Sequence, residues 1–216
     1  MTLPSHRRSM REAFEQEIVA AAGEAFAAHG LEGFSLRKLA LRLRCSPGTL
    51  YLYFKNKEDL LHAVVERAFE KLLEAIRSQP KTGNVFADLR QWFLAYVRFG
   101  LRFPNEYRCA FVLPSISRTK PYRPHAAFEV LRSYLQVGMA NGTFRKSDVD
   151  RTAQVLWAGV HGLTSLFIAR PGFPWVKRES LVDALAQSLI EGLLAPNGKT
   201  SAKSRRSTSR STRASK

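Results

Sequence analysis

Cysteine, acidic side chains and long apolar runs are all scarce in this sequence. Its two cysteines, Cys45 and Cys109, have a separation that fits neither a disulfide scaffold nor a zinc ribbon. The most apolar stretch, at 156–169, has 14 residues, whereas a membrane-spanning helix needs roughly 20. The N-terminus also lacks the apolar core of a secretory signal. We therefore expect a soluble, cytoplasmic chain with reduced thiols, no metal, no cofactor and no membrane contact.

The short motifs that mark common catalytic sites are missing as well. The sequence has no G-x-S-x-G, no P-loop, no H-E-x-x-H and no Rossmann glycine pattern. We therefore predict that the chain is not an enzyme. A helical enzyme that acts on a small bound molecule stays open as an alternative hypothesis.

Basic residues outnumber acidic ones by 34 to 18, which gives a formal net charge of +16. Such an excess indicates a polyanionic partner, such as nucleic acid. The excess is uneven, because residues 197–216 hold seven basic side chains and no acidic one, whereas residues 1–56 hold eight against five. Ser, Thr, Lys and Arg dominate the tail at 196–216, so we expect it to be disordered.

Apolar residues recur at three- and four-residue spacing along most of the chain, which predicts an all-α fold. A first helix ends at Gly30, where glycine is a common helix stop. The stretch 84–103 has apolar residues on two sides, so we expect it to be buried inside a helical bundle. Further long helices are expected at 57–79, 105–113, 125–140, 148–169 and 177–194.

Residues 30–61 hold a compact pattern of two short helices joined by a tight turn. Ser35 is placed to cap the first, and Ser46 with Pro47 begins the second, which we expect to reach Phe54. Helix, tight turn and short helix form the arrangement that places a recognition helix in the major groove of DNA. The apolar face of the first helix is formed by Leu36, Leu39, Ala40 and Leu43.

The second short helix carries groups that suit contacts with DNA. Gly48 lets a phosphate approach the free backbone N–H groups at the helix start. Hydroxyl and apolar groups for phosphates, thymine methyls and base edges come from Thr49, Tyr51, Leu52 and Tyr53, and positive charge from Lys55 and Lys57. The alternative for these residues is a solvated helix edge.

Residues 14–61 resemble the N-terminal domain of the TetR family of bacterial transcriptional regulators. The resemblance rests on AFAAHG at the end of the first helix, then GFSLRKLA, then CSPGTLYLYFKNKEDLL. It implies a dimer that binds a near-palindromic operator and releases DNA when a ligand binds the C-terminal helices. By position, it implies DNA contacts from Ser35, Arg37, Ser46, Pro47, Gly48, Thr49, Tyr51, Leu52, Tyr53 and Lys57.

One departure from the family pattern concerns the turn. The family usually has Ala-Gly-Val there, and this chain has Leu43-Arg44-Cys45. Arg44 lacks the freedom of glycine at positive φ. Either the turn has a different backbone, or Arg44 adopts that geometry and adds a phosphate contact.

The second half of the chain carries a weaker resemblance. The segment LWAGVHG at 156–162 is similar to the W-x-x-x-H-G pattern of one subgroup of regulator C-terminal domains. Such domains pair through their last two helices, here 148–169 and 177–194. Small residues for a close approach are Ala158, Gly159 and Gly162, and a leucine stripe comprises Leu181, Leu185, Leu189 and Leu193.

Aromatic residues of the second half are candidates for lining an effector pocket. Spacing alone does not separate a pocket from a packed core, so both interpretations stay open. Such a lining favours an apolar or amphipathic effector. The candidates are Trp92, Tyr96, Phe99, Phe103, Tyr107, Trp157 and His161.

The sequence therefore predicts a ligand-responsive repressor in three parts. Residues 1–56 form a helix-turn-helix domain that binds double-stranded DNA, residues 57–195 a helical domain for an unidentified small-molecule effector and for dimerisation, and 196–216 a basic tail. Ligand binding would tilt the helix at 57–79 and change the spacing of the two recognition helices. The alternative is an architectural nucleic-acid-binding protein driven by charge.

Removal of the tail distinguishes these two hypotheses. A chain ending at Ala195 loses the seven basic side chains of 197–216. Because each neutralised phosphate contributes about 0.9 to the slope of log K against log salt concentration, we expect a flatter salt dependence and an unchanged operator preference. Binding titrations on operator and random DNA at several salt concentrations measure both. Loss of most of the affinity for every sequence would favour the architectural protein.

Overall fold

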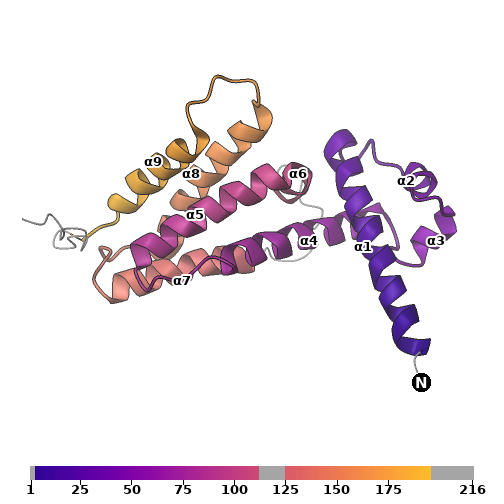
Figure 1. Cartoon of the computed structure of the whole chain (residues 1–216), viewed down its shortest axis with the longest axis horizontal. Coiled ribbons are helices and arrows are strands. Elements are labelled where there is room, and N and C mark those ends of the chain that lie inside the picture. Colours follow the sequence, from indigo (N-terminus) through magenta and orange to yellow (C-terminus); the bar gives the residue numbers. More distant parts are fainter. Residues whose placement is uncertain (1–2, 112–124, 196–216) are drawn as a thin grey trace, which may run out of the picture.

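A computed structural model describes residues 3–111 and 125–195, and the predicted tail lies outside these ranges (Figure 1). The described residues form helices and no strand, and one isolated bridge pairs Phe144 with Leu194. The all-α prediction is confirmed. The helices are α1 Leu3–His29, α2 Leu36–Arg42, α3 Pro47–Tyr51, α4 Lys57–Arg77, α5 Val85–Arg102, α6 Pro104–Phe111, α7 Ala126–Ala140, α8 Val149–Ala169 and α9 Arg178–Glu191.

Side-chain caps explain where several of these helices begin. The side chains of Asn56 and Asn84 accept hydrogen bonds from backbone N–H groups in the first turns of α4 and α5. The sequence-based boundaries differ most at α3, which ends at Tyr51 rather than Phe54. The backbone N–H groups of Tyr53 and Phe54 both turn back to the carbonyl of Leu50, so the chain leaves the helix in a tight turn.

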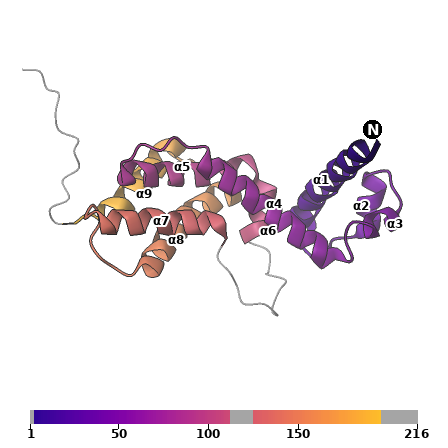
Figure 2. The ribbon, with the colours of Figure 1, turned by 90° about the horizontal axis from the view of Figure 1, so that it is seen from below.

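The helices form two units, seen apart in Figures 1 and 2. The first comprises α1, α2, α3 and the start of α4 around a small apolar core. Its centre includes Ile18, Phe26 and Leu50, and Phe26 stacks on Phe34 with ring centroids 4.0 Å apart. Leu60, Leu61 and Val64 of α4 belong to this core. The predicted domain boundary between residues 56 and 57 stays a prediction. It would assign these three residues to the second domain, although they pack in the core of the first unit.

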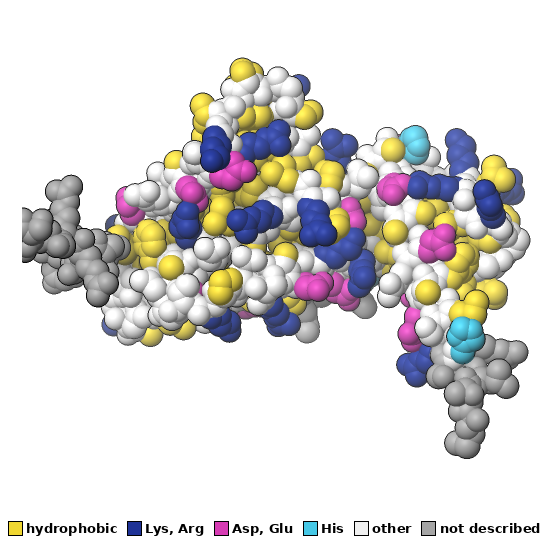
Figure 3. Space-filling view, viewed as in Figure 1, with side chains coloured by type: hydrophobic (Ala, Val, Ile, Leu, Met, Phe, Trp, Pro, Cys, Tyr) yellow, Lys and Arg dark blue, Asp and Glu magenta, His cyan; other side chains and the backbone are white. Residues whose placement is uncertain are grey.

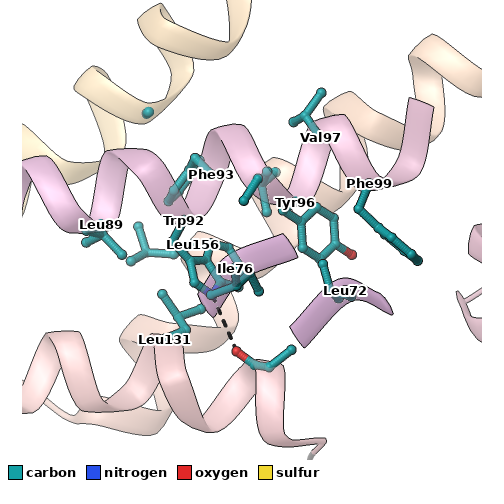
Figure 4. Packing of buried hydrophobic residues seen from close by; sticks show 14 of the residues in the cluster. Leu72, Ile76, Leu89, Trp92, Phe93, Tyr96, Val97, Phe99, Leu131 and Leu156 are labelled. Atoms are coloured by element: carbon teal, nitrogen blue, oxygen red, sulfur yellow. Dashed lines mark hydrogen bonds between the residues drawn. The ribbon is translucent and has the colours of Figure 1, made fainter. Parts of the chain in front are cut away.

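The second unit is a bundle in which α5 is the central helix. This helix contacts α4, α6, α7, α8 and α9, and it has buried residues around most of its circumference. Leu89 and Phe93 are fully buried, and Trp92 donates a hydrogen bond from Nε1 to the carbonyl of Ala127 on α7, at 3.3 Å (Figure 4). The buried position predicted from the two apolar rows of 84–103 is confirmed.

Helix α8 is the one helix of the described part that is long and apolar enough to cross a membrane, judged by length and composition alone. The sequence analysis judged a membrane span too short from the 14-residue apolar stretch at 156–169. The whole helix has 21 residues, so its length alone does not exclude a span. In the structure it packs on α5, α7 and α9 and buries Leu156, Val160 and Phe167 among others. Other apolar residues of α8, Val155 and Leu166 among them, are exposed in this chain.

The turn between α2 and α3 has the backbone that the glycine of the family would adopt. Arg44 has φ of 53° and is the non-glycine residue with positive φ in the described ranges. Its N–H donates to the carbonyl of Leu41, and the N–H of Cys45 donates to Ala40, which is the hydrogen-bond pattern of a Schellman helix end. Arg44 therefore adopts the left-handed geometry rather than changing the turn.

Substitution Arg44→Gly tests the strain at this turn. A non-glycine residue in the left-handed region is strained by about 1 kcal/mol, so the glycine variant should unfold at a urea concentration higher than the wild type. Arg37→Gly is the matched control, because Arg37 is exposed and helical. It should lower the free energy of unfolding by about 0.5–1 kcal/mol. Equal destabilisation by both changes would contradict strain at Arg44.

Candidate nucleic-acid interface and effector cavity

The start of α3 is held by its own side chains. Ser46 accepts a hydrogen bond from the N–H of Thr49 at 3.1 Å, and the two hydroxyls lie 2.9 Å apart. Pro47 occupies the first helical position and Gly48 is exposed beside it. The predicted cap is confirmed, and it presents the helix start with an open surface that a phosphate can approach.

Two large apolar side chains of this segment point into solvent. Tyr51 is 55% exposed and Leu52 is 74% exposed, whereas Leu50 and Phe54 are buried. Leu50 and Phe54 thus form the inward side of this segment. Exposed apolar groups on so short a helix indicate a binding surface.

Two of the predicted DNA contacts are partly used within the protein. The ring of Tyr53 packs edge-to-face on Phe14 at 5.6 Å, and the guanidinium of Arg11 lies 5.5 Å from its centroid. The ammonium of Lys57 donates to the carbonyl of Leu31 at 3.4 Å. These contacts fix α3 and the start of α4 against α1 and the loop that follows it.

The other predicted phosphate contacts surround α3. Arg37, Arg44 and Lys55 are exposed, and Ser35 is half-buried, with its hydroxyl accepting the capping hydrogen bond from the N–H of Lys38. Figure 3 shows Lys and Arg side chains over both units on this face of the molecule. Positive charge is therefore not confined to the helix-turn-helix, and the surface of α3 itself is mainly uncharged.

A cavity of about 540 Å³ lies in the bundle between α4, α5, α6, α7 and α8. Of the predicted ligand contacts, Trp92, Tyr96, Trp157 and His161 line it. Such a volume is within the usual range for small-molecule sites, which is about 300–1,000 Å³. The remaining lining residues are Phe69, Leu72, Phe111, His125, Ala127, Phe128, Gln154 and Ala158.

Three predicted ligand contacts do not line the cavity. Phe99 is buried in the bundle core, and Phe103 packs under the ammonium of Lys71 at 4.5 Å. They share a helix face with Trp92, but a helix advances about 1.5 Å per residue, so Phe103 lies roughly 16 Å further along α5. Tyr107 lies behind the wall, where its hydroxyl is 2.6 Å from Nδ1 of His161.

Sequence analysis missed the lining residues of α4, α6 and α7. Phe69 and Leu72 lie in the helix predicted at 57–79, whose helical spacing does not show whether a residue faces core or cavity. His125 stacks on Phe69 at 4.2 Å and its Nδ1 caps α7. The position of His125 at the start of the helix predicted at 125–140 was the one signal in the sequence for this part of the lining.

A network of polar groups lies in one wall of the cavity. Nε1 of Trp157 donates to the hydroxyl of Tyr96 at 3.1 Å, and this hydroxyl is 3.2 Å from Nδ1 of His161. Burial raises the pKa values of the Tyr96 and Tyr107 hydroxyls, so both keep their protons. Burial also lowers the pKa of His161 below 6.5, which favours a neutral imidazole.

Family models match both units of the chain. Residues 18–64 match the model described as bacterial regulatory proteins, tetR family, and residues 89–193 match a tetracyclin repressor-like C-terminal domain. The chain belongs to the TetR family. It is therefore a DNA-binding transcriptional regulator with a C-terminal ligand-binding domain, and not an enzyme, as predicted. Membership of the W-x-x-x-H-G subgroup stays a prediction.

Two curated relatives match parts of the chain. An uncharacterized HTH-type transcriptional regulator of Haemophilus influenzae is 32% identical over 85 residues, which are 39% of this chain and 46% of that protein. The fatty acid metabolism regulator protein of Bacillus subtilis is 34% identical over 65 residues, or 30% of this chain and 34% of that protein. The chain thus spans less than half the length of these relatives.

Solved TetR-family structures share the fold over most of the chain. The regulator PfmR from Thermus thermophilus has a TM-score of 0.64 at 23% identity, covering 82% of this chain and 99% of its own. The fatty acid degradation regulator FadR from Bacillus halodurans has a TM-score of 0.67 at 20% identity, covering 82% and 94%. At this identity the similarity shows the fold.

Two half-buried histidines, His125 and His161, predict how the stability of this TetR-family bundle depends on pH. The pKa values of His125 and His161 are lowered in the fold, mainly by burial. Below pH 6.5, the ordinary value, the unfolded chain therefore binds protons before the folded chain does. The free energy of unfolding should fall as the pH decreases through 6.5 towards the lower folded values, as urea titrations would measure.

Substituting single histidines shows which of them causes the pH dependence of the free energy of unfolding. His161→Gln should make the loss of stability between neutral and acidic pH shallower, because one group of lowered pKa is removed. His6→Gln is the control, since His6 is exposed on α1. An unchanged pH dependence in His161→Gln would show that this imidazole does not titrate with unfolding.

Proposed function

We propose that the protein is a homodimeric repressor that binds a palindromic operator in the cytoplasm and releases it when a small apolar or amphipathic effector enters the bundle. The observation that carries this proposal is a capped, solvent-facing recognition helix in the same chain as an aromatic cavity in contact with α4. The names of the relatives include a fatty acid metabolism regulator, which is consistent with an apolar effector.

The proposed contacts with DNA divide into two kinds. Tyr51, the last residue of α3, and Leu52, its C-cap, are exposed and are our candidates for reading base edges and thymine methyls. The hydroxyl groups and cations around them contact phosphates and set the position of the helix. We assign this second role to Ser35, Arg37, Arg44, Ser46, Thr49, Lys55 and Lys57, with Pro47, Gly48 and Tyr53 shaping the approach.

Dimerisation through α8 and α9 is supported by the apolar groups that these helices leave uncovered. Val155 is 57% exposed and Leu166 is 50% exposed on α8, with small Ala158 and Gly162 between them. The leucine stripe is half-buried in one chain, whereas the neighbouring row of α9, Val182, Ala186 and Ile190, is buried. A second copy would cover this surface and place two recognition helices on one DNA site.

Helix α4 is the proposed route from effector to DNA. Its residues Phe69 and Leu72 line the cavity, and its first turns belong to the core of the DNA-binding unit. Helix α6 lies beside it, because Lys71 pairs with Glu106 at 2.7 Å. An effector that displaces Phe69 would tilt α4, so the two recognition helices would no longer match successive major grooves.

The recognition helix is tested on an operator selected from a random DNA pool. Tyr51→Ala and Leu52→Ala should each weaken operator binding by about 5–150-fold, since a base contact contributes about 1–3 kcal/mol. Binding to random DNA should stay unchanged, and so should stability, because both side chains are exposed. Fluorescence anisotropy at fixed salt measures these affinities.

Val137→Ala is the matched control, because Val137 on α7 is 55% exposed and lies in the bundle. It should leave operator binding unchanged. If Tyr51→Ala and Leu52→Ala keep full operator preference, α3 does not read the sequence and the proposed interface is wrong.

A further inference from the structure

We infer that the first turns of α1 form a second DNA-contacting element beside α3, in which Arg11 binds a phosphate of the DNA backbone. The inference rests on the proposed function, because that function places DNA against α3, and it adds a contact from outside the helix-turn-helix segment. It depends on the exposure of these turns, on the position of Arg11 beside Tyr53 and on the charges that surround Arg11.

The first turns of α1 extend beyond the hydrophobic core of the DNA-binding unit. Among the described residues, Phe14 is the first of α1 that packs on this core, and the described side chains from His6 to Ala13 are all exposed. At 1.5 Å per residue, residues 3–13 project roughly 15 Å past the core. The core does not use these turns, so their surface is open to a partner.

These turns lie at the same end of the molecule as the recognition helix. Figures 1 and 2 show the N-terminal end of α1 at the end that carries α2 and α3, away from the bundle. The ring of Phe14 meets that of Tyr53 edge-to-face at 5.6 Å, and Tyr53 directly follows the exposed Leu52. DNA that lies against Leu52 therefore passes close to the first turns of α1.

Arg11 is oriented by the recognition segment itself. Its guanidinium lies over the ring of Tyr53, with the central carbon 5.5 Å from the ring centroid. A guanidinium is planar, so a group that uses its face against a ring still has N–H donors along its edge. These donors match the oxygens of a phosphate in a bidentate contact. Tyr53 thus holds a phosphate-binding group beside the end of α3.

No ion pair among the described residues neutralises Arg11. The ion pairs that α1 forms there join Arg8 to Glu12, at 3.1 Å, and Glu24 to Arg42. Arg11 is exposed and takes part in neither of them. Its charge is therefore available to a phosphate, and such a contact releases counter-ions from the DNA.

Acidic residues of α1 are placed against another helix. Glu12 and Glu15 line a groove between α1 and α4, together with Glu66 and Glu70 of α4. The side of α1 that contacts Tyr53 carries Arg11 instead. DNA beside α3 would therefore meet a cation of α1 before it meets these carboxylates, which favours a polyanion on this side of the helix.

The salt dependence of DNA binding tests the inference on the full-length protein. Arg11→Gln should flatten the slope of log K against log salt concentration by about 0.9 for each Arg11 in the complex, or about 1.8 for a dimer. Affinities for the selected operator and for random DNA should fall by the same factor, about tenfold or more at 0.1 M salt, because a phosphate carries no sequence information. Fluorescence anisotropy at several salt concentrations measures both.

Two further variants separate a phosphate contact from a structural role. Arg11→Lys keeps the charge and should keep the slope. Arg145→Gln is the matched control, because it removes the same charge from an exposed residue between α7 and α8, whose connection lies at the end of the bundle away from α3 (Figure 1). It should leave the slope unchanged. If Arg11 only supports Tyr53, Arg11→Gln weakens operator binding at an unchanged slope, and the inference is wrong.

Neutral methylphosphonate groups, placed one at a time in the backbone of the operator, locate the contact. In each half-site, one replacement should weaken binding of the wild type and leave binding of Arg11→Gln unaffected, because the variant no longer uses that phosphate. Every replacement having the same effect on both proteins would contradict the assignment.

Failure of the proposed function gives a different result. A wild-type protein that prefers no DNA sequence refutes sequence reading by α3, and the salt slope on random DNA still decides whether Arg11 binds a phosphate. An unchanged slope in Arg11→Gln, with operator preference intact in the wild type, overturns the inference alone.

Discussion

One continuous helix belongs to two hydrophobic cores, and the rest of the molecule depends on it. The first half of α4 contributes Leu60, Leu61 and Val64 to the core of the helix-turn-helix unit, and its second half contributes Ala68, Leu72 and Ile76 to the bundle. These six residues form one stripe at helical spacing. Because the stripe has no break, the two cores cannot move independently of the direction of α4.

Helix α6 strengthens this constraint from the side. It packs on α1, α4 and α5, and its residues face different cores. The thiol of Cys109 is buried in the first core and donates to the carbonyl of Gly23 at 3.5 Å, while Tyr107 belongs to the bundle core. Burial raises the pKa of Cys109 to about 12, so this thiol stays protonated and serves as a small apolar group.

The sequence predicted best the features that local chemistry determines. Ser35 and Ser46 cap helices because each cap is formed with a residue three positions away. Spacing also showed which faces of α4 and α5 are apolar. The effector cavity depends instead on five helices that meet in space, so the sequence could not distinguish Trp92 at the cavity from Phe99 in the core. The sequence showed that Arg44 replaces the glycine of the family pattern, but it did not show that Arg44 keeps a positive φ.

The position of α4 in the cavity wall gives the proposed regulation an energetic basis. An effector shifts an equilibrium between two states only through a difference in its affinity for them, and a few kcal/mol suffice for most of the shift. Phe69 and Leu72 of α4 line the cavity beside Phe111 of α6. A tilt of α4 therefore changes the wall against which a ligand packs. A ligand packed against this wall would then bind the two states with different affinities, and that difference would oppose operator binding.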